Sequence, residues 1–156
     1  MATHRPESKT LDVLLELKDA GLIAADENAT QVDGTDAIID LGEGRVKGEL
    51  IINVTACEVD TGDEVYKIVP LFSNDAAHAS GVVAGPVMYL GDAAGIAAIL
   101  DAATVPPDTD MVEGRYVIPF TNMYGNNTYR YMLLSVEVSG TIASGINFIS
   151  YATKLY

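Results

Sequence analysis

Several residue types on which catalytic and metal sites depend are scarce in this chain. It has no Trp, one Cys and two His among 156 residues. A single Cys excludes both an internal disulfide and a cysteine-based metal cluster. The lack of Trp argues against a glycosidase and against a sugar-binding module, because such sites usually add aromatic platforms to their carboxylates.

The motifs of common enzyme classes are also missing. No Gly-x-Ser-x-Gly elbow occurs, and the Gly-rich stretch 41–45 lacks the spacing and the Lys of a phosphate-binding loop. His4 and His78 lie far apart, whereas a zinc site needs three or four ligands. We therefore expect no catalytic residues, no metal and no organic cofactor, and we interpret Cys57, in an alternating apolar stretch, as an inert, partly buried thiol.

Basic residues and long apolar runs are scarce too. Nine Lys and Arg stand against 22 Asp and Glu, a formal net charge of −13, which repels phosphates and anionic membranes. No segment approaches the roughly 20 apolar residues that span a bilayer, and the first nine residues are mostly polar. We expect synthesis in a cytoplasm and neither nucleic acid nor a membrane as a partner.

What is present favours one folded domain preceded by an arm. Hydrophobic residues make up 49% of the chain, enough to build a core. Residues 1–9 read as an extended arm, and 10–21 as a short helix with a hydroxyl N-cap and a terminal Gly. We assign 1–34 to this arm and helix. Its apolar face must cover either the sandwich itself or a neighbouring molecule, and we favour contact with an assembly partner through these leucines: Leu11, Leu14, Leu15 and Leu17.

From residue 35 onward the sequence is typical of an all-β domain. Short β-branched runs alternate with Gly, Asn, Asp and Pro. The alternation in 46–56 indicates a strand with one buried face, and the middle of 129–138 is apolar on both faces. We predict an antiparallel β-sandwich over 35–156, with strands near 37–41, 45–59, 64–74, 82–89, 114–121, 127–139 and 145–155. The Ala-rich stretch 91–107 predicts an excursion with one or two helical turns.

Two further groups of residues are candidates for binding. Four carboxylates fall within 58–64, where Asp60, Asp63 and Glu64 could hold Ca²⁺, although a solvated turn is favoured because the spacing differs from an EF-hand. Tyr residues gather in the last third, either as cross-strand partners within a sheet or as a protein interface. The candidate interface residues are Tyr116, Tyr124, Tyr129 and Tyr131.

Several phrases occur in an order that resembles a known family. Ile-Asp-Leu-Gly at 39–42 opens the β domain, Ser-Asn-Asp at 73–75 ends a strand, and Ile-Pro-Phe at 118–120 precedes the long run from Tyr129. Over roughly 35–155 the chain resembles the small capsid decoration, or cement, proteins of tailed bacteriophages.

The resemblance implies a jelly-roll fold and a virion structural protein. Such a protein forms a homotrimer on the outer capsid surface and stabilises the lattice of the phage major capsid protein, without catalytic residues. The N-terminal segment and the excursion at 91–105 depart from the pattern and are candidate capsid or trimer contacts. The alternative is a small β-sandwich binding module for a receptor or carbohydrate, in a Ca²⁺-dependent form if the acidic loop binds the ion.

Overall fold

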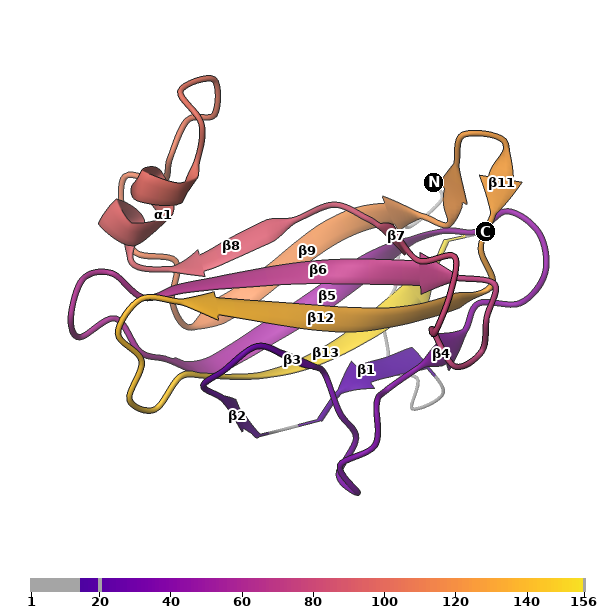
Figure 1. The fold of residues 1–156 in the computed structure, drawn as a ribbon, viewed down its shortest axis with the longest axis horizontal. Helices are drawn as coiled ribbons and strands as arrows, with labels where there is room; N and C mark the ends of the chain where they lie inside the picture. Colours follow the sequence, from indigo (N-terminus) through magenta and orange to yellow (C-terminus); the bar gives the residue numbers. More distant parts are fainter. Residues whose placement is uncertain (1–14, 20, 156) are drawn as a thin grey trace, which may run out of the picture.

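The computed structural model describes residues 15–19 and 21–155, which form two packed antiparallel sheets and one short helix (Figure 1). The first sheet contains β1 (Glu16–Lys18), β2 (Leu22–Ile23), β5 (Lys47–Cys57), β9 (Gly114–Thr121) and β13 (Ile146–Lys154). The second contains β3 (Glu27–Asn28), β4 (Ile39–Asp40), β6 (Val65–Ser73), β7 (Val83–Ala84), β8 (Met88–Gly91) and β12 (Tyr131–Ser139). A small hairpin joins β10 (Met123–Tyr124) to β11 (Asn127–Thr128), and the helix is α1 (Ala93–Ile99).

The strand order is that of a jelly roll. The short strands β1 with β2, β3 with β4, and β7 with β8 each act as one edge strand. The first sheet then runs β1-β13-β5-β9 and the second β3-β12-β6-β7. Counted along the chain with each of these pairs taken as one strand, the strands number from 1 to 8. The first sheet then has the order 1-8-3-6 and the second 2-7-4-5, which is the arrangement of a double-sheet jelly roll. The predicted all-β, jelly-roll-like antiparallel sandwich is confirmed.

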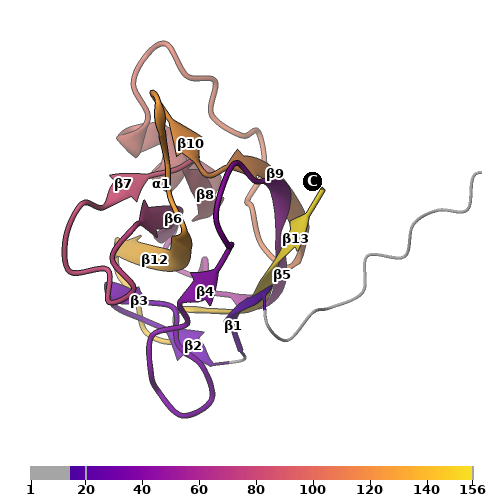
Figure 2. The same cartoon turned by 90° about the vertical axis from the view of Figure 1, so that its right-hand side faces the viewer.

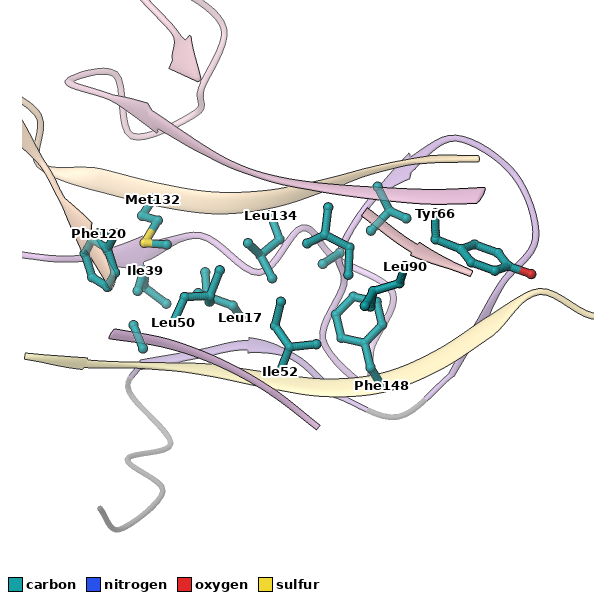
Figure 3. Close-up of a cluster of buried hydrophobic side chains, with 14 of the residues drawn as sticks. Leu17, Ile39, Leu50, Ile52, Tyr66, Leu90, Phe120, Met132, Leu134 and Phe148 are labelled. Atoms are coloured by element: carbon teal, nitrogen blue, oxygen red, sulfur yellow. The ribbon is translucent and has the colours of Figure 1, made fainter. Parts of the chain in front are cut away.

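The core lies between the two sheets, as Figure 3 shows. The predicted alternation in β5 is confirmed, because Leu50, Ile52 and Val54 all belong to this core. Opposite them, β6 and β12 contribute further buried side chains, including Phe72 and Leu134. The period of two sets which face of each strand is buried, and a slip of one residue would turn the apolar set outward.

The predicted N-terminal helix is wrong where the structure describes it. Glu16–Lys18 forms β1, which pairs antiparallel with β13, and Leu17 is fully buried among the core side chains (Figure 3). A local helix signal of a few residues is outweighed here by cross-sheet pairing and core burial. Leu17 is therefore not a partner contact.

The predicted boundary at residue 34/35 is wrong for the same reason. β1 and β2 pair with β13, and β3 pairs with β12, so residues 16–28 are edge strands of the sandwich rather than part of an arm. Leu15 is partly buried and packs against the core. Leu11 and Leu14 lie outside the described residues.

Two other expectations concern the region after β6. The helical turns predicted in 91–107 are confirmed as α1, with Asp92 as N-cap accepting a hydrogen bond from the Gly95 N–H at 2.8 Å. The strand predicted at 82–89 is divided into β7 and β8 around Gly85, where a Cβ would lie 2.8 Å from Phe72 and 2.9 Å from the Tyr124 hydroxyl. Among the described residues, no helix has the length and apolar character needed to cross a membrane.

The burial of Leu17 yields a direct test. We expect Leu17→Ala to lower the free energy of unfolding by about 2–5 kcal/mol, because it leaves a cavity in the core. Leu22→Ala is the control: Leu22 lies in the neighbouring edge strand but is 58% exposed, and its loss should cost no more than about 0.5 kcal/mol. Urea denaturation followed by circular dichroism measures both, and equal, small effects would contradict the placement of β1.

Candidate interaction face

One side of the sandwich is bordered by free sheet edges. The strand order leaves β9 at the edge of the first sheet and β7 and β8 at the edge of the second, and Figures 1 and 2 show β8 and β9 side by side. The excursion 93–107 projects from one end of this side and the β10–β11 hairpin from the other (Figure 1). We call this region the open side and define it as residues 79–107 and 116–129.

The two segments that define the open side carry little charge, whereas the connection between them, 108–115, contains Asp108, Asp110, Glu113 and Arg115. Asp92 and Asp101 are the only charged residues in 79–107, and 116–129 contains no Asp, Glu, Lys, Arg or His. By contrast, 20% of the whole chain is charged and its net charge is −13. The Asp101 carboxylate accepts a hydrogen bond from the Ala103 N–H at 2.8 Å, so both aspartates stabilise local turns.

Large apolar side chains are exposed on the same side. Five of the exposed large hydrophobic residues belong to it: Val82, Val87, Ile99, Val105 and Val117. Depletion of charge together with exposed apolar and aromatic residues is the composition of a protein interface core. The open side is therefore the best candidate for a functional surface in the described part of the chain.

An aromatic series connects this side to the core. The ring of Tyr124 lies 5.5 Å from that of buried Phe72 and 6.2 Å from that of Tyr129, and Phe72 lies 6.0 Å from Phe120, all between centroids. Burial raises the pKa of the Tyr124 hydroxyl. These rings close the gap between β7 and the end of β9 and hold the surface in one shape.

The structure brings three of the four predicted interface tyrosines to the open side. Tyr124 and Tyr129 belong to the aromatic series, and Tyr116 lies on β9, with its hydroxyl donating to the Val112 carbonyl at 2.7 Å. All three also pack against the core of the sandwich, and their role in a protein interface stays a prediction. Tyr131 lies elsewhere, on β12, with the Arg130 guanidinium 5.4 Å from its ring.

The acidic loop at 58–64 is a structural clamp. The buried Glu58 carboxylate accepts hydrogen bonds from the N–H groups of Ser144 at 2.6 Å and Gly145 at 2.7 Å, which ties the β5–β6 loop to the β12–β13 loop. Asp63 extends the same link by accepting from the Thr141 N–H at 2.9 Å. The sequence signal missed here is that an acid in a tight turn usually bonds to backbone N–H groups.

Glu64 is the most enclosed member of this clamp, with no exposed surface. Burial alone would raise its pKa, but donors from Thr61 and from the Gly62 and Asp63 N–H groups bring the pKa down to about 2. Its carboxylate oxygens are thus directed at the loop itself, whereas Asp60 is exposed to solvent. In the described residues, no group of three or more His, Cys, Asp or Glu side chains is arranged to hold a metal ion.

Burial shifts the pKa of both Cys57 and His78. Burial raises the pKa of the half-buried Cys57 thiol to about 12, with the negative charges of nearby carboxylates adding to the effect, as expected of an inert thiol. His78 lies in a turn in which its backbone N–H donates to the Asp75 backbone carbonyl at 2.9 Å. Burial lowers the pKa of its imidazole. His4 lies outside the described residues.

Comparisons of the chain with protein families, with curated proteins and with solved structures find no match.

The carboxylate clamp predicts a specific acid sensitivity. A carboxyl whose pKa is lowered by folding stabilises the protein above its unfolded pKa and loses that effect as the pH falls towards the folded value. We expect Glu64→Gln to lower Tm by several degrees at pH 7, and this gap from the parent protein to narrow between about pH 4.5 and 2.

Glu43→Gln is the control, because the Glu43 side chain is 92% exposed and its carboxylate forms only a long ion pair, 3.8 Å from the Arg130 guanidinium. Thermal melts at pH 7, 5 and 3 should place this variant within a degree or so of the parent at each pH. A Glu64→Gln gap that stays constant down to pH 3 would contradict the assigned role of the carboxylate.

Proposed function

We propose that this chain is a virion structural protein, a capsid decoration protein that trimerises on the outer surface of a phage capsid and stabilises the major capsid lattice. The observation that carries the proposal is the low charge of the two open-side segments, which hold only Asp92 and Asp101, on a chain whose net charge is −13. The jelly-roll strand order and the sequence phrases at 39–42, 73–75 and 118–120 support the same assignment.

Electrostatics explains why the open side suits self-association. Copies of a chain with this charge repel one another within the screening length of the solution, which is about 8 Å at physiological salt. Contact between copies is least costly where neither surface carries charge, and exposed apolar residues such as Val87 and Val117 then gain from burial. Acidic residues elsewhere keep the particle exterior soluble.

Assembly on a repeating lattice also lowers the affinity that each single contact must have. A trimer that holds several capsid subunits at once binds with a high effective concentration, so that each subunit needs only a modest footprint. Such a role requires no catalytic group and no organic cofactor. The protein would be made in the host cytoplasm and would act on the outside of the virion.

The alternative of a Ca²⁺-dependent binding module has less support. It relied on the acidic loop, and Glu58, Asp63 and Glu64 are engaged by N–H and hydroxyl groups of the chain itself. A binding module without Ca²⁺ would have to use the open side, where five large exposed side chains are apolar and the exposed polar side chains of Asn126, Asn127 and Thr128 are confined to the β10–β11 hairpin.

Solution mass tests the proposal. We expect the purified full chain to give three times the 16.5 kDa of a single chain by multi-angle light scattering, and to co-sediment with capsids that lack their decoration protein. A stable monomer across micromolar concentrations would contradict the trimer. A trimer that binds no capsid from any candidate host would leave assembly intact but remove the decoration role.

A further inference from the structure

A cyclic trimer places a geometric demand on its subunits. A self-complementary patch closes a dimer, whereas a three-fold ring needs two different patches, one on each side of every subunit contact. If the chain forms the proposed trimer, the open side must therefore present two complementary features. The described residues offer one convex and one concave apolar feature on this side.

The convex feature is the excursion 93–107, which we call the projection. It stands clear of the sandwich at the α1 end of the open side (Figure 1). Its charged residue is Asp101, and beyond Pro106 and Pro107 the chain continues through Asp108 and Asp110 before it meets the sandwich again. Its outer surface includes Ile99 and Val105, and the latter is 89% exposed, a large cost for an apolar side chain that has no partner.

The concave feature lies near the other end of the open side. It is a shallow groove of about 500 Å³ lined by Lys47, Pro86, Pro119, Phe120, Thr121 and Tyr124. Lys47 is the only charged residue in this lining, and the aromatic series described above fixes the position of Tyr124. The groove is rigid and apolar and has a single positive charge at its rim.

The projection cannot fill the groove of its own subunit. After the projection the chain meets the sandwich at Met111, which bridges Gly91 at the end of β8, and then enters β9. The groove lies at the far end of β9, so the length of this strand separates the two features by roughly 23 Å at the rise of an extended chain. Both features belong to the charge-poor surface through which copies with a net charge of −13 can approach. Lys47 in the groove lining and Asp101 on the projection have opposite charges, and each also interacts within its own chain.

We infer that the projection of one copy docks in the groove of the next, head to tail, and that this contact repeated three times closes the trimer. The inference rests on the proposed trimer and adds its mode of contact. The occupant of the groove is a second copy of this chain.

Cysteine cross-linking tests the contact in the full-length protein. In a Cys57→Ser background, one chain carries Val105→Cys and a second, differently tagged chain carries Pro86→Cys, and the two are co-expressed. We expect a short bismaleimide to join the two tags efficiently, with little product from either single-cysteine chain alone. Light scattering of the same samples reports the oligomeric state.

The outcomes separate the two proposals. A trimer without the mixed product, or one in which Val105→Cys chains join each other equally well, would overturn the head-to-tail contact and leave the proposed trimer standing. A monomer by light scattering would overturn both.

A charge placed on the projection gives a second measurement with a matched control. Val105→Asp should raise the trimer dissociation constant by about tenfold or more, because it buries an unpaired carboxylate in the contact. Val32→Asp introduces the same change at a site that is 86% exposed and lies outside the open side, and should leave the constant within about twofold. Equal effects of both variants would contradict the docking.

Discussion

The rest of the structure depends on two central strand pairs, β5 with β13 and β6 with β12. Each pair runs in antiparallel register for nine or so residues and directs one apolar face into the space between the sheets. Leu50 and Phe148 from one pair meet Phe72 and Leu134 from the other in a single core. Because these pairs occupy the middle of the two large sheets, the remaining strands of those sheets are edge strands, and the edges of β8 and β9 come to lie together.

The distribution of charge follows from this arrangement. The clamp of Glu58, Asp63 and Glu64 concentrates carboxylates at the loops where β5 leads into β6 and β12 into β13, where each has N–H donors to compensate it. The two open-side segments hold only Asp92 and Asp101, and each of these also accepts a hydrogen bond from a backbone N–H. The acidic residues are thus unevenly distributed along the chain, and the proposed contact between copies would account for their scarcity in these two segments.

The sequence predicted the elements whose formation depends on a local pattern of residues. The alternation in 46–56 located β5 and its buried face, and the Ala-rich stretch located α1, because both signals lie within a single element. The pattern at 10–21 failed, since Leu17 is fixed by pairing with a strand more than a hundred residues away. The sequence predicted the open side only in part. It identified Tyr116, Tyr124 and Tyr129 as candidates, but it could not predict that 79–107 lies beside 116–129, because the strand order of the two sheets brings these segments together.

The proposed decoration role rests on the order of short sequence phrases, and the open side is the surface on which the proposed assembly would depend. Hydrogen–deuterium exchange at two protein concentrations, one below and one above the assembly midpoint, tests that surface most directly. The account predicts that peptides within 79–107 and 116–129 gain protection on assembly, while those covering 30–45 do not. Protection gained only outside the open side, or none despite a rise in mass, would contradict it.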